Sequence, residues 1–359
     1  MHKSVTLLLI LVFLTAACMT KPLPVKAEYK GNITINTDGN VNPSIAPLEL
    51  AGNVYSLTND INGTITVNNN NMLLDGNNHR LTVPSIFTYG ITLGYVSNVT
   101  VANFAITGGA KGIDIRGTAN TVANNTITNA DNGFYSLSQP TAAIALTDAS
   151  STVIAGNKLK SCRVGLILYS GQSKQCSNNQ IVGNNFVGCS TAIIVYDSSN
   201  NRFYQNNFFN NGILLQDSGY YGYSLPSFNV WDDGQQFGNY WSDYLVRYPN
   251  ATEIETTGVG DTSYFVKPNN YVDPATLSRQ EAKDYWTHMN AQYANNTDHY
   301  PLMQPFMAAP SPTPVPSPTQ TTEPFPIVPV AAASVATIAV AGVGLLVYFV
   351  KFKKRSDRT

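Results

Sequence analysis

The chain is poor in cysteine, in charged residues and in histidine. It has four cysteines in 359 residues, and if Cys18 leaves with an N-terminal signal the remaining three do not suit a disulfide scaffold. Charged residues make up 12% of the chain. Residues 28–326 carry 21 acidic and 13 basic side chains, a net charge of −8, which argues against nucleic acid as a partner. The fold must therefore hold by packing rather than by covalent links.

Long apolar runs are confined to the two ends of the chain. Lys3 precedes an apolar run of signal-peptide length, and we predict cleavage after Ala27. Lipid attachment at Cys18 is a weaker alternative. Residues 330–350 are uncharged and, at ~1.5 Å per residue, span ~31 Å, about one hydrocarbon core. The basic residues that follow predict a single-pass anchor with a cytoplasmic C-terminus and an extracellular ectodomain.

Two further features fit an exported chain. Residues 308–326 are dense in Pro, Ser and Thr, which favours an extended polyproline stalk. Asn-x-Ser/Thr sequons predict glycosylation, although an Asn- and Thr-rich chain also forms them by chance. These sequons lie at Asn32, Asn62, Asn98, Asn124, Asn250 and Asn295.

A repeat is the most informative pattern. Short apolar runs start at residues 90, 112, 143, 165, 192 and 212. A second series, apolar-x-x-Asn-x-apolar, keeps step with the first and places Asn at 125, 157, 184 and 206. Such runs are too short for independent helices or hairpins, and about 22 residues make one circuit of a three-sided coil. The recurring Asn predicts an amide ladder between coils. We therefore predict an all-β fold, a right-handed single-stranded parallel β-helix, and not a β-sandwich, which needs longer strands and hairpin turns.

The predicted organisation follows from these boundaries. It consists of a signal peptide (1–27), an N-terminal cap (28–60), β-helix repeats (61–231), a C-terminal cap with a helical insertion (232–307), the stalk (308–326), a transmembrane helix (327–350) and a basic cytoplasmic tail (351–359).

The segments 229–234, 238–244, 258–264 and 300–303 carry a resemblance to a known family. Together with the coils they resemble NosD-like surface proteins, many of them archaeal, and the related carbohydrate-binding and sugar-hydrolase (CASH) repeats of the pectin lyase-like fold. The resemblance covers residues 60–306. It implies the fold strongly and the family's role in copper-site assembly weakly. Two departures are a thinned acidic run and an insertion at 266–297, which holds a helix predicted from Ser278 to about Tyr293.

Several residues are candidates for binding or chemistry. The outward positions of the repeated strand are apolar, and if exposed they would form a strip that binds sugar or protein; residues 240–306 folding over them is the alternative. The strip comprises Ile167, Tyr169, Ile194, Tyr196 and Leu214. Asp197 and Asp217 are weak catalytic candidates, expected one coil apart, with turn-forming roles as the alternative.

Metal and thiol sites are also considered. A calcium site is weighed against a hydrogen-bonded cap at Asp232, Asp233, Asp243 and Asp261. Copper requires soft or imidazole ligands, and the sparse set His288, Met289, His299 and Met303 makes it improbable. No cofactor is required. Cys162 and Cys189 fall at matching places on adjacent coils, where either a disulfide or two buried thiols would fit.

Three functions remain open from the sequence. The first is a non-catalytic surface protein that binds glycans or envelope proteins, or that builds the envelope. The second is a polysaccharide hydrolase or lyase, and the third a copper-handling accessory protein of the NosD type. The first is preferred, because turn-forming roles are favoured for Asp197 and Asp217 and no basic residue lies in register to serve as a lyase base.

Overall fold

The computed structural model describes residues 27–131, 141–171, 176–217, 227–269, 278–280, 283–284, 287 and 296–307. The chain divides into two units, Met1–Ala309 and Pro310–Thr359, and all described residues belong to the first. The expected stalk, membrane helix and tail lie outside the described residues, as does all of the signal peptide except Ala27. Within the described part of the chain, no helix has the length and apolar character needed to cross a membrane.

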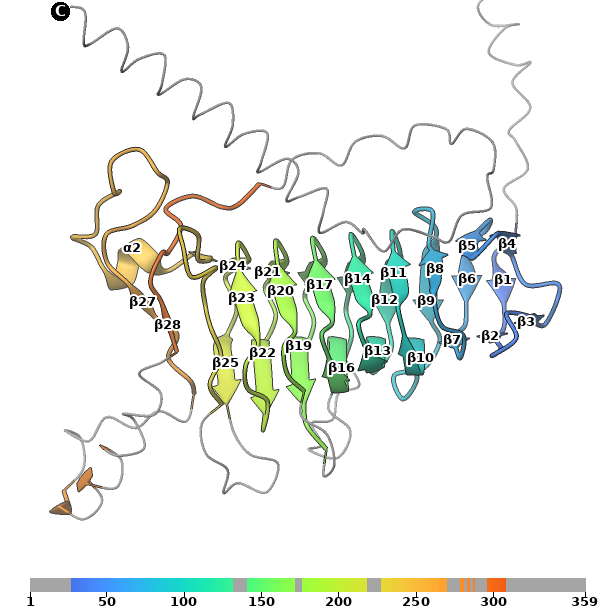
Figure 1. Ribbon diagram of the computed structural model, residues 1–359, viewed down its shortest axis with the longest axis horizontal. Coiled ribbons are helices and arrows are strands. Elements are labelled where there is room, and N and C mark those ends of the chain that lie inside the picture. The colour runs from blue at the N-terminus through green and yellow to red at the C-terminus, as the bar shows by residue number, and fades with distance from the viewer. Residues whose placement is uncertain are drawn as a thin grey trace, which may run out of the picture. The chain divides into compact units, whose positions relative to one another are not determined.

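Three sheets of short strands run along a stack of coils (Figure 1). Sheet A contains β1 (Tyr29–Lys30), β6 (Ile61–Asn62), β9 (Arg80–Val83), β12 (Ala105–Gly108), β15 (Thr126–Thr128), β18 (Lys158–Lys160), β21 (Asn185–Val187), β24 (Asn207–Phe209) and β26 (Tyr240–Trp241). Sheet B contains β3 (Val41–Asn42), β2 (Ile33–Ile35), β7 (Ile65–Val67), β10 (Tyr89–Ser97), β13 (Lys111–Thr118), β16 (Ala142–Ser150), β19 (Val164–Tyr169), β22 (Thr191–Tyr196) and β25 (Ile213–Asp217). Sheet C contains β4 (Leu48–Ala51), β5 (Val54–Leu57), β8 (Met72–Asp75), β11 (Val99–Ala102), β14 (Thr121–Ala123), β17 (Val153–Ala155), β20 (Gln180–Val182) and β23 (Arg202–Tyr204).

Successive strands of each sheet pair in parallel, so the predicted parallel β-helix is confirmed. The coils begin earlier than predicted. Strands β1, β2 and β5, within the expected cap of residues 28–60, already pair in parallel with β6, β7 and β8. At this end of the coils, β3 pairs antiparallel with β2 in sheet B, and β4 pairs antiparallel with β5 in sheet C. The parallel pairing also extends past residue 231, because β26 pairs with β24.

The predicted amide ladder lies between sheets C and A. Asn157 accepts hydrogen bonds at Oδ1 from the backbone N and from Nδ2 of Asn125, at 2.9 and 3.0 Å. Asn184 accepts the same pair from Asn157, and Asn206 from Asn184. Each buried amide thereby accepts hydrogen bonds from the asparagine of the coil before it. These bonds offset the cost of burying a polar group.

A second ladder, which the sequence analysis missed, lies between sheets B and C. Asn179 Oδ1 accepts from Thr152 N at 2.9 Å, Asn201 Oδ1 from Asn179 N at 3.1 Å, and Asn229 Oδ1 from Asn201 N at 3.0 Å. A signal for it was present, because Asn179 and Asn201 each precede an Asn of the first ladder by five residues. Two asparagine ladders therefore brace two of the three corners of each later coil.

The last coil is closed by aromatic rings. Phe186, Phe208, Trp241 and Tyr264 stack in one column with centroid distances of 4.9, 4.4 and 4.4 Å. Phe203 stacks on Trp231 at 4.4 Å. Helix α2 (Tyr244–Arg247) and the antiparallel pair β27 (Tyr264–Phe265) and β28 (Thr297–Asp298) lie beyond these rings. Of the predicted helical insertion, Lys283 N donates to Arg279 O, a helical bond, while most of the segment lies outside the described residues.

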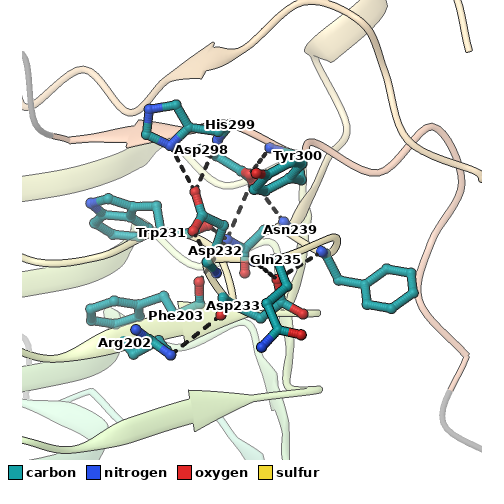
Figure 2. A network of polar contacts seen from close by, with 12 residues as sticks. Arg202, Phe203, Trp231, Asp232, Asp233, Gln235, Asn239, Asp298, His299 and Tyr300 are labelled. Atoms are coloured by element: carbon teal, nitrogen blue, oxygen red, sulfur yellow. Dashed lines mark hydrogen bonds and ion pairs between the residues drawn. The ribbon is translucent and has the colours of Figure 1, made fainter. Parts of the chain in front are cut away.

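A polar network fastens the closing segment to the final coil (Figure 2). The carboxylate of Asp298 accepts at Oδ2 from Asn239 N at 2.7 Å and from Trp241 Nε1 at 2.8 Å. His299 places Nδ1 2.8 Å from Asp232 Oδ2. Because Asn239 is the last amide of the first ladder, Asp298 supplies the acceptor that a further coil would otherwise provide.

Candidate functional site

The outer face of sheet B changes character from one coil to the next. Its central column reads Thr92, Asp114, Ala145, Ile167, Ile194 and Gln216, in the register of strands β10 to β25. The inner positions stay aliphatic throughout, for example Ile113, Ile144 and Leu166. In this column, a charged residue therefore occurs only at β13.

The strip predicted to bind ligand is not open in the structure. Ile167 and Ile194 are 1% and 0% exposed, and they pack with Tyr196 and neighbouring small side chains in an apolar cluster separate from the main core. Tyr169 packs against this cluster and meets Tyr196 edge-on, with centroids 6.3 Å apart. Of the two alternatives considered for these side chains, the structure therefore has the covered face and not the open strip.

Leu214 does not belong to this face. It lies beside Ala192 in the register, and it packs against the main core. Leu215 pairs with Ile193, so the last interval is 22 residues and Gln216 takes the outer position beside Ile194. Gln216 Nε2 donates to the Tyr196 hydroxyl at 3.2 Å.

A charged cluster replaces the apolar strip at β13. Lys111 Nζ lies 2.6 Å from Asp114 Oδ1, and Arg116 Nε lies 3.5 Å from Asp114 Oδ2. The side chains of Lys111 and Asp114 are 5% and 0% exposed, whereas that of Arg116 is 37% exposed. Such a buried ion pair is costly to desolvate, so it is weak evidence for a stabilising role.

Two tyrosines flank this cluster. Lys111 Nζ lies 4.6 Å from the ring centre of Tyr89, and Arg116 Cζ lies 5.8 Å from that of Tyr95. Burial, with a further contribution from the carboxylate of Asp114, raises the pKa of Tyr89. Tyr95 is 59% exposed. The result is a half-buried set of cations with an accessible aromatic ring on one side.

Tyr95 is held in a conformation that costs energy. The register of β10 with β13 shifts between Leu93 and Val96, and the φ angle of Tyr95 is +56° in this irregularity. Asp148, within β16, and Asp197, just after β22, have φ of +51° and +48°, and Asp tolerates this region. A bulky ring there costs ~1–3 kcal/mol, and such strain concentrates at functional sites.

The sequence analysis missed Lys111, Arg116 and Tyr95. A signal existed, because Lys111, Asp114 and Arg116 are charges inserted at outward positions of an otherwise apolar strand. Their proximity could be found only with the correct register, in which residue 116 follows residue 114 on the same face despite the bulge.

The weak catalytic candidates are not paired across adjacent coils. Asp217 lies opposite Val195, two residues from Asp197, as the corrected register requires. Asp217 is buried and accepts from Ser227 N at 2.9 Å, and desolvation raises its pKa to about 7, with Asp197 adding repulsion. Asp197 has the positive φ expected of a turn, which agrees with the alternative role considered for it.

The four aspartates considered for calcium have separate partners. Asp233 Oδ1 accepts from three backbone N–H groups, and Asp261 bonds Thr252 and Thr262. Asp243 accepts from the Tyr264 hydroxyl at 2.9 Å, while Asp232 bonds Gly234 N and His299. Among the described residues no three His, Cys, Asp or Glu side chains form a group that could hold a metal ion. The structure therefore has the hydrogen-bonded cap that was weighed against calcium, with separate partners for each of the four carboxylates.

The two cysteines stack on adjacent coils as free thiols. Cys162 and Cys189 are buried and unbridged, so the structure has the thiol alternative and not the disulfide. The neighbouring thiol of Cys189, together with burial, raises the pKa of Cys162.

The remaining candidates are placed as follows. Of the sequons, Asn32, Asn98, Asn124 and Asn250 are exposed and Asn62 is half-buried, so glycosylation stays a prediction. Met303 packs against the main core. Asn295, His288 and Met289 lie outside the described residues.

These observations define the class of protein: a parallel β-helix braced by asparagine ladders, with a charged and aromatic patch on one outer face. The chain belongs to the NosD family, whose description is periplasmic copper-binding protein (NosD) and which matches residues 28–246. Membership places the chain among β-helix proteins that work outside the cytoplasm. No curated protein matches the chain.

The family description raises the question of copper, and the described residues do not fit it. Nδ1 of His79 pairs with Asp60 at 3.1 Å, and Nδ1 of His299 pairs with Asp232. Cys162, Cys176 and Cys189 are buried among the coils. Copper prefers several converging imidazole or sulfur ligands, and no such group occurs in the ranges that the structure describes.

Proposed function

We propose that this NosD-family protein is anchored at the outer surface of the cell membrane and binds glycan chains without cleaving them. The binding site is the outer face of sheet B at β10 and β13, formed by Tyr89, Tyr95, Lys111, Asp114 and Arg116. The observation that carries the proposal is the exposed, strained Tyr95 beside the half-exposed Arg116.

Recognition of sugars requires apolar ring faces and hydrogen-bonding groups side by side. Tyr95 is exposed over more than half of its surface, and Arg116 brings N–H donors next to its ring. Lys111 and Asp114 lie beneath and fix the position of the guanidinium. The uncharged segment 330–350 and its basic flank support the membrane anchor.

Binding is favoured over hydrolysis by the separation of the carboxylates. Inverting glycosidases hold two carboxyl groups ~6.5–9.5 Å apart, and retaining enzymes ~5–5.5 Å. Asp114 in β13 and Asp217 in β25 are four strands apart in sheet B, about 19 Å at ~4.8 Å per strand. Asp148, nearer in the sheet, already accepts a hydrogen bond from Gly171 N. Asp114 itself is held between two cations.

A glycan array with the purified full-length chain tests this proposal. We expect binding to a subset of glycans, loss of that binding in Tyr95→Ala, and no new reducing ends when the bound glycan is incubated with the chain. Phe228→Ala is the matched control, since Phe228 is an exposed aromatic residue near the last coil of sheet C. Release of reducing ends that stops in Asp114→Asn would contradict the proposal, as would a chain that binds no glycan.

A further inference from the structure

We infer that the glycan carries carboxylate groups and that Arg116 binds one of them. This inference rests on the proposed function and names the chemical class of its ligand. It starts from the charge of the cluster, in which Lys111 and Arg116 face the single carboxylate of Asp114. The cluster therefore has one positive charge in excess, in a region between residues 28 and 326 with a net charge of −8.

The excess charge resides on Arg116. Asp114 Oδ1 lies 2.6 Å from Lys111 Nζ and also accepts from Thr147 Oγ1 at 3.4 Å. The guanidinium of Arg116 approaches Asp114 Oδ2 only to 3.5 Å, as an ion pair without a hydrogen bond. Its Nε is buried against Asp114 and so is closed to a ligand. The side chain is 37% exposed, so the terminal Nη groups are the donors that can meet an incoming acceptor.

Geometry favours a carboxylate as that acceptor. A planar guanidinium donates two parallel hydrogen bonds to a carboxylate, which gives both strength and orientation. The ring of Tyr95 lies on the guanidinium side of the cluster, so a sugar ring stacked on Tyr95 would bring its carboxylate to Arg116. One carboxylate of a uronate chain fits a site with one excess cation.

The test measures binding of hexagalacturonate and of its fully methyl-esterified form to the full-length chain by calorimetry. The ester keeps the sugar ring and removes the charge. We expect the acid to bind about tenfold or more tighter, as a charge-assisted hydrogen bond of ~1.5–3 kcal/mol implies. The Arg116→Gln variant should bind the acid only as tightly as it binds the ester, and its affinity for the ester should equal that of the natural chain. Arg80→Gln, which removes an exposed arginine from sheet A, should leave both affinities unchanged.

The outcomes separate this inference from the proposed function. Equal binding of acid and ester, or a preference that survives in Arg116→Gln, would overturn the carboxylate assignment and leave glycan binding intact. Tighter binding of a sulfated hexasaccharide than of the uronate would overturn it in the same way. If no glycan of any kind binds, the proposed function fails with it. Thermal unfolding of each variant shows whether the fold is retained. Arg116→Lys keeps the positive charge but loses the planar guanidinium with its two parallel donors, so it should bind the acid with intermediate affinity.

Discussion

The interior of the coils and the outer face of sheet B follow different rules. Inside, a position keeps its residue type coil after coil: Asn157, Asn184 and Asn206 occupy one place and make the same contacts. Outside, the column that passes through Asp114 changes from polar to charged to aliphatic. Each coil presents the same interior to its neighbours, so selection for packing repeats the residue. The outer face is under no such constraint, so its residues can differ from coil to coil.

The largest expected effect comes from breaking the interior rule. Asn184→Ala removes an amide that accepts from Asn157 and donates to Ile154 O, Val182 O and Asn206 Oδ1. The buried partners would be left unsatisfied, and we expect the free energy of unfolding to fall by about 3 kcal/mol or more. Urea denaturation gives this value.

The neighbouring residue provides the control for that experiment. Asn185 is half-buried, and its Oδ1 accepts one hydrogen bond, from Asn207 Nδ2 at 2.9 Å. Asn185→Ala should cost about 1 kcal/mol or less. Similar losses in the two variants would show that the ladder adds nothing beyond ordinary surface contacts.

The end of the ladder should respond to pH. Burial raises the pKa of Asp298 to about 7, against the backbone and indole N–H groups that lower it. A carboxyl whose pKa is raised in the folded state adds stability when protonated, and this contribution is lost as pH rises through about 7. Between pH 7 and pH 5 we expect stability to gain at most ~1.4 kcal/mol per pH unit from this group.

Asp298→Asn removes that titration. Urea denaturation at pH 5 and pH 7.5 should show a smaller difference for the variant than for the natural chain. Asp217, whose pKa is also raised to about 7, contributes equally to both proteins and cancels in the comparison. Identical pH dependence in the two would mean that Asp298 is already ionised throughout this range.

The difference between the repeated interior and the outer face explains how much of the structure could be predicted from the sequence. The β-helix and its first asparagine ladder followed from two series in step, because an interior repeated in space is repeated in sequence. The register of Leu214 could not be predicted in this way. The residue at which a strand starts does not determine which residues of the neighbouring strand it pairs with. The cap was also beyond reach. Asp298 meets Asn239 and Trp241 across nearly sixty residues, and only folding brings such distant groups together.

The smallest expected effect on the free energy of unfolding comes from replacing Tyr95 on the outer face of sheet B. Tyr95→Asn places in the left-handed region a residue that tolerates it, which should release ~1 kcal/mol or more of strain. The lost contact with Arg116 offsets ~0.5–1 kcal/mol. We therefore expect the free energy of unfolding to stay constant or to rise by up to about 1 kcal/mol, while glycan binding is lost.

The reciprocal change isolates the strain from the contact. Asn98 is exposed, also has a positive φ of +61°, and lies just beyond β10. Asn98→Tyr should cost about 1 kcal/mol or more beyond the loss of the 3.1 Å hydrogen bond from Asn98 Nδ2 to Asn71 Oδ1, because a ring is disfavoured in this backbone region. If Asn98→Tyr costs nothing, the backbone of Tyr95 is not strained, and its exposed ring would be an ordinary surface residue. If Asn98→Tyr is destabilising and Tyr95→Asn is not, the tyrosine is kept at an energetic cost. A ligand that stacks on its ring is then the physical reason for keeping it.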